Sequence, residues 1–568
     1  MIRKLMQSIR EFKLFSLLSP LFVVLEVVME VVIPILMAKL IDDGIDGSGG
    51  IDAVMHYGWI LLVCCVLSLI FGALAGHFAA FSSAGFARNL RHDMFYRVQD
   101  YSFSNIDKFS AASLVTRMTT DVTNVQNAYQ MLIRVALRSP VMLIFSMAMA
   151  FHLSAKLALI YLAAIPVLGV GLYFIMTRVH PIFERVFKTY DKLNNVTQEN
   201  LHGIRVVKSF VRENHEIQKF SGISENIYQD FSRAEKRLAF NMPLMQFCMY
   251  VCLILVSWFG ARMIVSRTLT TGELMSLMTY AIQILSSLMM LSMVFVMITM
   301  SRASCERIVE VLDEESDITS PADAVTAVPD GSVDFNHVSF SYSKREDKCC
   351  LEDVDLHIPA GMTVGILGGT GIPRLYDATV GTVQVGGIDV RRYDVETLRQ
   401  EVAMVLQKNV LFSGTIKENL RWGDPDATDE EMERVCRLAH ADEFIQTFPE
   451  GYDTYIEQGG SNVSGGQKQR LCIARALLKK PKILILDDST SAVDTHTDAC
   501  IRQALRDEIP DTTKIIIAQR VTSLMDADQI IVLDEGRMDG IGTHEELLKN
   551  NAIYREVYES QQKGSVPQ

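Results

Sequence analysis

Paired cysteines at zinc-binding spacing are missing from this sequence. None of its ten cysteines forms a Cys-x-x-Cys motif with a second ligand pair, so a zinc site is not expected. Positive charge is also scarce: 54 Lys and Arg stand against 67 Asp and Glu, a net charge of −13 that argues against a general nucleic-acid binder. The first residues, MIRKLMQSIREFKLF, contain no small-residue cleavage site, so no cleavable signal peptide is expected.

Long apolar runs, by contrast, are abundant. Hydrophobic residues make up 49% of the 568 residues, and the mean hydropathy of +0.19 is high for a soluble protein. This length allows two or more domains. Six apolar segments reach or exceed the ~20 residues that cross a bilayer as a helix, and their succession predicts a membrane domain. They are centred on residues 21–40, 59–81, 132–151, 157–176, 244–265 and 274–300.

The charges between these segments orient them. Lys and Arg are concentrated at the N-terminus and in the connections 88–138 and 178–237, whereas the link DDGIDGSGGID after the first segment has four Asp and no Lys or Arg. The positive-inside bias therefore predicts that both termini and both basic connections face the cytoplasm. The connections keep helical periodicity, so the helices are expected to continue beyond the membrane. Such extensions either transmit motion between the membrane half and the cytoplasmic half, or form a cytoplasmic helical bundle with no coupling role.

Two acidic residues interrupt the first apolar segment. Glu26 and Glu30 are four residues apart and therefore share one face of a helix. Charged groups at membrane depth usually face a cavity or a partner. The sequence leaves two roles open for them: attraction of a cationic substrate, or a structural role in which they pair with a neighbouring helix or lie near the membrane interface.

The second half of the chain has a different pattern. After a polar linker at residues 316–332, short strands alternate with helices, which predicts an α/β domain over residues 333–568. In KPKILILDDSTSAVD, a buried strand delivers Asp487 at its end, as in nucleotide hydrolases that hold Mg²⁺. In GGSNVSGGQKQRLCIARALL, a hydroxyl and two glycines open a helix whose N-terminus can meet a phosphate. The residues concerned are Ser464, Gly465, Gly466 and Gln467.

With these motifs, and with VLQKNVLFSGTIKENL, the chain resembles the ATP-binding-cassette transporters over nearly its whole length. It is most similar to bacterial multidrug exporters in which one membrane domain is fused to one nucleotide-binding domain. The resemblance implies six long transmembrane helices within residues 1–315, followed by a cytoplasmic α/β P-loop domain. It also implies ATP and Mg²⁺ as cofactors, and a place in the bacterial inner membrane.

The resemblance also assigns roles to individual residues. It implies that Tyr342 stacks on adenine and that Gln407, with Asp487, lies at the Mg²⁺ ion and the attacking water. It implies that the signature Ser464–Gln467 closes over ATP held by another subunit. Asp494 is similar to the aspartate that communicates across the family's dimer.

The phosphate loop departs from the family pattern. Gly368, Gly369, Thr370 and Gly371 match its start, but the Lys, the Ser or Thr and the following helix are missing. The Lys would carry charge to the β- and γ-phosphates, and the hydroxyl would bind Mg²⁺. We therefore expect the chain to hold ATP poorly. The gap has three possible origins: an engineered deletion, a damaged gene, or residues omitted from the sequence. An omission would separate the Cα atoms of Gly371 and Ile372 by more than the ~3.8 Å of a trans peptide link.

Two further departures concern catalysis. The family's general base, a Glu, is Asp488 here, and loss of a well-placed base typically costs 10²–10⁴ in rate. The family's switch His is Gln519, which has no titratable ring. In heterodimeric exporters of this family, such substitutions mark the subunit with a degenerate site, while each site combines the phosphate loop of one chain with the signature of the other.

The resemblance thus implies one subunit of a heterodimeric exporter of drugs or lipid-like amphiphiles. Its own nucleotide site is expected to be degenerate, and its signature is expected to complete the partner's competent site. Two alternatives stay open: a non-transporting regulatory subunit, and a peptide or lipid exporter. The expected partners are a second half-transporter subunit, membrane lipid and an amphiphilic substrate, with no nucleic acid.

Overall fold

The computed structural model describes residues 1–47, 49–342, 349–367, 375–489 and 492–563. The chain folds into two compact units, and one short segment from the first half of the sequence belongs to the second unit. The first unit consists of Met1–Gln99 and Ala111–Glu314, and the second of Asp100–Ser110 and Glu315–Gln568.

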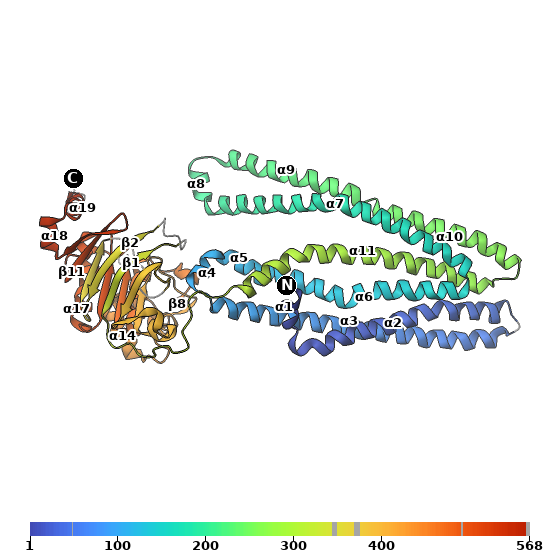
Figure 1. Cartoon of the computed structure of the whole chain (residues 1–568), viewed down its shortest axis with the longest axis horizontal. Coiled ribbons are helices and arrows are strands. Elements are labelled where there is room, and N and C mark those ends of the chain that lie inside the picture. Colours follow the sequence, from blue (N-terminus) through green and yellow to red (C-terminus); the bar gives the residue numbers. More distant parts are fainter. Residues whose placement is uncertain (48, 343–348, 368–374, 490–491, 564–568) are drawn as a thin grey trace. The chain divides into compact units, whose positions relative to one another are not determined.

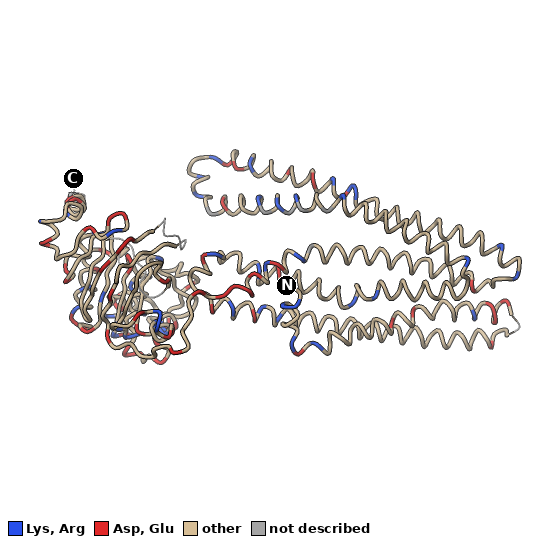
Figure 2. The backbone as a smooth tube through the Cα atoms, viewed as in Figure 1, with Lys and Arg blue, Asp and Glu red and all other residues tan. Residues whose placement is uncertain are grey.

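The first unit is entirely helical within the described residues, and six of its helical stretches are long and apolar enough to cross a membrane. Lys, Arg, Asp and Glu are sparse along the middle of these helices (Figure 2). The prediction of six long membrane helices is confirmed. The basic connections are also helical, as predicted (Figure 1). The helices are α1 (Ile2–Gln7), α2 (Lys13–Lys39), α3 (Gly50–Gln99), α5 (Ala111–Thr116), α6 (Val122–Leu153), α7 (Ala155–His202), α8 (Ile204–Ser209), α9 (Glu213–Leu238), α10 (Asn241–Val265) and α11 (Thr271–Asp313).

Buried tyrosines hold the helices of this unit together. The Tyr161 hydroxyl on α7 donates to the backbone carbonyl of Leu277 on α11 at 2.7 Å. The Tyr280 hydroxyl on α11 donates to the carbonyl of Val31 on α2 at 2.6 Å. Each ring fills apolar space while its hydroxyl finds an acceptor, so neither tyrosine leaves a buried polar group unsatisfied.

Glu26 and Glu30 pair with a neighbouring helix. Arg138 on α6 donates through Nη2 to Glu30 Oε1 at 2.6 Å, and its Nη1 lies 3.4 Å from Glu26 Oε1. Of the two roles that the sequence left open, helix pairing is the one present in the structure. The arrangement joins α2 to α6, because an uncompensated charge is costly at membrane depth.

The second unit contains two main sheets. A four-stranded antiparallel sheet has the order β2-β1-β4-β5, and a six-stranded sheet has the order β12-β11-β3-β10-β9-β6, in which all neighbours except β12 are parallel. This is the predicted α/β class. The strands are β1 (Val333–Phe340), β2 (Leu351–Ile358), β3 (Thr363–Leu367), β4 (Val380–Val385), β5 (Ile388–Asp389), β6 (Val402–Val405), β7 (Gly414–Thr415), β8 (Tyr455–Ile456), β9 (Ile483–Asp487), β10 (Thr513–Ile517), β11 (Gln529–Asp534) and β12 (Arg537–Gly542).

The second unit also contains helices, and one of them comes from the first half of the chain. Segment 100–110 carries α4 (Phe103–Lys108), which begins at a Ser102 cap. The Ser104 hydroxyl donates to Asp317 at 2.8 Å, and Asn105 Nδ2 donates to the Glu315 carbonyl at 3.1 Å, so α4 is anchored to the start of the second unit. The other helices are α12 (Val395–Glu401), α13 (Ile416–Leu420), α14 (Asp429–Leu438), α15 (Asp442–Ile445), α16 (Gly465–Leu478), α17 (Thr495–Glu508), α18 (His544–Asn550) and α19 (Ala552–Lys563).

Candidate nucleotide site

The parallel strands β6, β9 and β10 bring three of the predicted site residues to one edge of the sheet. Val405 pairs with Leu486, and Ile517 pairs with Asp487, so the residues that follow each strand emerge side by side. These residues are Gln407 after β6, Asp488 after β9 and Gln519 after β10. The carboxyl ends of parallel strands are where α/β sheets bind ligands.

Asp488 and Gln407 contact each other at this edge. Gln407 Nε2 donates to Asp488 Oδ2 at 3.4 Å, a long hydrogen bond. The Asp488 backbone has a φ of 46°, in the left-handed region, and its N–H donates to the Ile517 carbonyl at 2.9 Å. Gln519 is exposed, and its carbonyl accepts a hydrogen bond from Gln561 Nε2 at 2.8 Å.

Asp487 lies at the tip of β9, half-buried, and its carboxylate forms no hydrogen bond or ion pair with any residue of the described ranges. Burial raises the pKa of this carboxyl, and the neighbouring charge of Asp488 raises it further. The ionised form is therefore penalised in the folded protein. A cation placed at Asp487 would relieve both penalties, which fits the predicted contact with Mg²⁺.

The raised pKa of Asp487 predicts that the substitution Asp487→Asn changes the stability of the fold. A carboxyl whose pKa is raised on folding destabilises the fold increasingly as the pH rises from its unfolded pKa through its folded pKa, because the folded state must carry a penalised charge. We expect Asp487→Asn to raise the melting temperature of the second unit's transition at pH 7 in the absence of nucleotide and metal. The gain should shrink as the pH falls and the wild-type carboxyl becomes protonated. Calorimetry between pH 4 and pH 8 checks this; a gain that grows on acidification would contradict it.

An aromatic group, Phe340, Tyr342 and Tyr376, lies across the site from Asp487. Tyr342 is 67% exposed, as a platform for a base would be, and its ring packs edge-to-face on Phe340 and Tyr376, with centroids 4.9 and 5.4 Å away. The Tyr376 hydroxyl donates to Asp107 on α4. Phe103 on the same helix lies 6.3 Å from the Tyr376 ring. The aromatic group therefore connects the site to segment 100–110.

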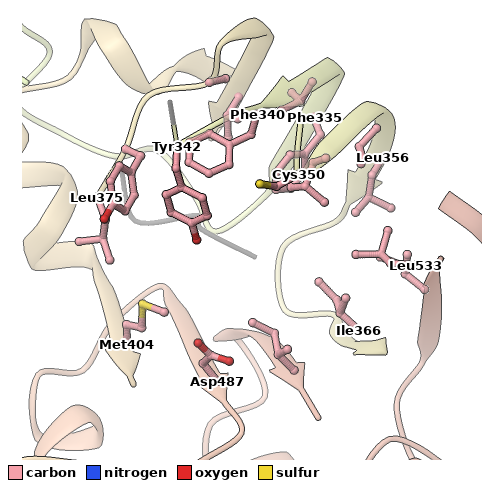
Figure 3. Close-up of a pocket in the computed structure, with 18 of the residues that line it drawn as sticks. Phe335, Phe340, Tyr342, Cys350, Leu356, Ile366, Leu375, Met404, Asp487 and Leu533 are labelled. Carbon is pink, nitrogen blue, oxygen red and sulfur yellow. The ribbon is translucent and has the colours of Figure 1, made fainter. Parts of the chain in front are cut away.

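A cavity of about 740 Å³ lies between the two sheets and joins these groups (Figure 3). Between β3 and β4, residues 375–379 contain no helix, and the apolar faces of the two sheets confront each other across open space. The predicted residues Tyr342, Gln407, Asp487, Asp488 and Gln519 all line this cavity. Apolar side chains make up most of the remaining wall: Phe335, Val338, Phe340, Leu351, Val354, Leu356, Ile366, Val383, Met404, Ile531 and Leu533.

The size of the cavity has an energetic consequence. At ~24 cal/mol per Å³, the value found for empty apolar cavities, 740 Å³ would cost roughly 18 kcal/mol. A typical domain is stable by only about 5–15 kcal/mol. An enclosed empty cavity of this size would outweigh the stability of the domain, so solvent or a ligand occupies the space between the sheets.

The described charges around the cavity do not suit a triphosphate. Among the described residues that line it, Arg391 is the sole basic side chain, and its Nη2 is engaged by Asp389 at 2.9 Å. The lining also includes Asp377, Asp487 and Asp488. The aromatic platform fits a nucleotide base and Asp487 fits Mg²⁺, but the described residues offer the phosphates no free cation. Gly368, Gly369, Thr370 and Gly371, and with them the distance from Gly371 to Ile372, lie outside the described residues.

The predicted signature begins a well-capped helix elsewhere in the same unit. Ser464 Oγ accepts from the Gln467 N–H at 3.3 Å, and Gln467 Oε1 accepts from the Ser464 N–H at 2.8 Å, a capping box at the start of α16. A Cβ on Gly466 would meet the Ala492 carbonyl oxygen at 2.9 Å, so only glycine fits there. Ser464 and Gly465 are exposed. The helix N-terminus is thus formed and open to an anion.

Asp494 caps the next helix. Its Oδ1 accepts from the Thr497 N–H at 2.9 Å, and this backbone hydrogen bond holds the pKa of the carboxyl below its ordinary value. The Gln469 Oε1 accepts from the Ala492 N–H at 3.0 Å, which ties α16 to the segment before Asp494. This hydrogen bond links the signature helix to the segment that leads into Asp494. The roles of both stay predictions, because neither lines the cavity.

Sequence reasoning missed Phe103, Asp107 and Tyr376. They come together because segment 100–110 packs beside residues 375–379, more than two hundred positions later in the chain. Such a contact leaves no local signal in composition or periodicity.

Comparisons with known proteins agree with this architecture. The family model described as the ABC transporter transmembrane region matches residues 16–289, and the ABC transporter model matches residues 351–491. An uncharacterized ABC transporter ATP-binding protein, YfiB of Bacillus subtilis, is 35% identical over 99% of this chain and 98% of its own length. The ATP-dependent lipid A-core flippase of Desulfotalea psychrophila is 32% identical, with 84% of each chain covered.

A solved structure shares the fold. The structure of a bacterial Atm1-family ABC exporter with ATP bound superposes with a TM-score of 0.84, at 23% identity, over 97% of this chain and 99% of that one. Six apolar helices followed by an α/β nucleotide-binding domain on one chain form an exporter half-transporter, a multi-pass membrane protein of a family that generally binds and hydrolyses ATP. On these grounds the chain belongs to the ABC transporters.

Proposed function

We propose that this chain is one subunit of a heterodimeric exporter of drugs or lipid-like amphiphiles in the bacterial inner membrane, with both termini in the cytoplasm. Its own nucleotide site is impaired, and its signature completes the competent site of a second half-transporter. The observation that carries this proposal is a contrast within one domain: the α16 N-terminus is capped and open, whereas the described residues around the chain's own cavity offer the phosphates no free cation.

The contrast argues against general decay of the domain. Decay would have affected the signature and the nucleotide site alike, yet Gly466 still sits where only glycine fits and the capping box is complete. Asp488 and Gln519 replace the family's usual Glu and His at the edge that faces the chain's own cavity. Both substitutions weaken this chain's site, and neither touches the signature group that a partner would use.

The kind of cargo is inferred from a relative and from the charges of the membrane unit. A relative is named as a lipid A-core flippase, and the six spanning helices provide a path for an amphiphile through the bilayer. The membrane charges Glu26, Glu30 and Arg138 are largely paired with one another. The helical unit therefore suits a largely apolar cargo with a modest polar head.

ATPase assays on the chain alone and on the chain co-purified with its partner test the proposal. Both preparations are reconstituted in the same lipid nanodiscs, with Mg²⁺ and saturating ATP. We expect the isolated chain to be close to background and the pair to turn over at least ~10²-fold faster, as general-base loss alone predicts. Comparable rates in the two preparations would refute the specialised-subunit proposal. Substrate flux into vesicles that continues without this subunit would assign it a regulatory role instead.

A further inference from the structure

The helical unit carries a groove between α7 and the junction of α9 with α10, where two apolar spans end and the basic connection 178–237 begins. We propose that this groove binds one anionic phospholipid of the surrounding bilayer, with its phosphate at Arg178 and Arg237 and an acyl chain along the apolar wall. The site goes beyond the proposed transport function, because its ligand is a resident lipid whose binding needs neither ATP nor a partner subunit.

The sequence places the two arginines at one depth in the membrane. Residues 157–177 of α7 and residues 238–261 of α9 and α10 contain no charged side chain, and about 20 such residues cross a bilayer as a helix. Arg178 directly follows the first run and Arg237 directly precedes the second, on segments that lie side by side (Figure 1). Both guanidinium groups therefore lie near the lipid phosphates, where basic side chains attract anionic lipid.

The two arginines are held in place without being neutralised. Arg237 Nη1 donates to the Arg178 backbone carbonyl at 2.8 Å. The Arg178 guanidinium lies over the Phe174 ring, 4.6 Å from its centroid, and this cation–π contact orients the group without cancelling its charge. Both arginines are exposed, and neither forms an ion pair with a carboxylate of the described residues. Two such groups suit a phosphate, whose oxygens accept charge-assisted hydrogen bonds from guanidinium forks.

The rest of the groove is apolar and is closed at its membrane end. There α7 and α10 approach so closely that a Cβ on Gly171 would lie 2.5 Å from Leu244 Cδ2. The groove encloses about 590 Å³, and an acyl chain in it would contact both helices while the phosphate stays at the arginines. The apolar side chains that line it are Phe174, Ile175, Phe240, Pro243, Leu244 and Phe247.

Charge selects the headgroup of the lipid. A phosphatidylglycerol carries one net negative charge at its phosphate. A phosphatidylcholine carries the same phosphate beside a quaternary ammonium group, which the two arginines would repel. The groove should therefore prefer the anionic lipid when the acyl chains of the two lipids are identical.

The experiment counts lipids bound to the full-length chain by native mass spectrometry after purification in a neutral detergent. Dioleoylphosphatidylglycerol and dioleoylphosphatidylcholine are titrated separately, each with and without inorganic phosphate as competitor. The double variant Arg178→Gln and Arg237→Gln removes both charges. Arg262→Gln is the matched control, because Arg262 is also exposed and lies over an aromatic ring, that of Trp258, at the other end of α10.

Two further variants test the apolar wall. Phe247→Ala removes an exposed ring that lines the groove, and Phe259→Ala removes an exposed ring of α10 that does not. We expect Phe247→Ala to weaken the binding of both lipids about fivefold and to keep the preference for phosphatidylglycerol. Phe259→Ala should change neither quantity.

We expect the wild type and Arg262→Gln to bind one phosphatidylglycerol per chain about tenfold or more tightly than phosphatidylcholine. A basic group near an anionic lipid contributes about fivefold in affinity, so the double variant should lose most of this preference. Inorganic phosphate should not displace the lipid, because it has no apolar part to fill the groove.

Three results would overturn the proposal. Equal affinity of the wild type for the two lipids would show that the arginines select no charge. A loss of preference in Arg262→Gln as large as in the double variant would show that any arginine at the membrane edge attracts anionic lipid equally. Displacement by inorganic phosphate would make the groove a site for free anions.

Folding of each variant is checked by its melting temperature. If the double variant fails to fold, Arg178→Gln decides alone, since the Arg178 guanidinium donates no hydrogen bond to the described part of the chain. The measurement contains neither ATP nor a partner chain. Its outcome is therefore independent of the ATPase comparison that tests the proposed function.

Discussion

Gly465→Asp is expected to abolish most ATP hydrolysis by the pair while leaving this chain as stable as before. Gly465 is the first residue of α16 and is exposed, and a Cβ there would make only an ordinary contact, 3.4 Å from the Ala492 Cβ. A carboxylate at a helix N-terminus is favourable for the helix itself. The same carboxylate would occupy the place of the incoming phosphate and repel it. Loss of such a preorganised anion site costs roughly 10²–10³ in turnover.

The measurement is steady-state ATPase of the reconstituted pair, with the melting temperature of the variant chain as a folding check. Ala552→Asp is the matched control, because Ala552 is the exposed first residue of α19, another helix N-terminus remote from the site. Asp488→Asn serves as a second control, since this chain's own base is expected to contribute little. Activity that survives Gly465→Asp, or that Asp488→Asn removes, would contradict the crossed arrangement.

A second large effect is expected from rebuilding the missing part of this chain's nucleotide site. We expect insertion after Gly371 of a complete phosphate loop, with its Lys and Ser and the following helix, to raise affinity for ATP by about 10²-fold, or about 2.7 kcal/mol. The Lys would supply the charge that Arg391 does not, and charge-assisted hydrogen bonds to phosphate are the strong ones. The helix would fill the space between the sheets and raise the melting temperature as well.

Equilibrium binding of a fluorescent ATP analogue to the full-length protein checks this expectation. An insertion that carries Ala in place of Lys is the matched control: it should keep the gain in melting temperature and lose most of the gain in affinity. An insertion that changes neither quantity would show that the cavity is not the place of the missing helix.

The fold could be predicted from the sequence because its signals are local. Each long apolar run became a helix, and KILILDD became β9 with Asp487 at its tip, as expected for a buried strand. The helix start at Ser464 followed from a capping residue and two glycines. Hydrophobic periodicity and capping act over a few residues, so a single sequence contains them in full.

The site could be predicted only in part, because its assembly depends on long-range contacts. Asp488, Gln407 and Gln519 lie at one edge of the sheet because β6, β9 and β10 are neighbouring strands. The sequence alone does not say which strands are neighbours. The segment between Gly371 and the next predicted strand is too short for a helix, which indicated that a helix was missing. It gave neither the volume of the cavity nor the approach of Phe103 from segment 100–110.

Photolabelling after vanadate trapping tests the central claim most directly, namely that hydrolysis occurs where the partner's phosphate loop meets this chain's signature. The pair is incubated with a photoreactive ATP analogue, Mg²⁺ and vanadate, irradiated and separated into its two chains. We predict that the trapped product labels the partner at least about tenfold more than this chain, because the described residues at this chain's own cavity offer the phosphates no free cation. Equal labelling of the two chains, or preferential labelling of this one, would contradict the claim.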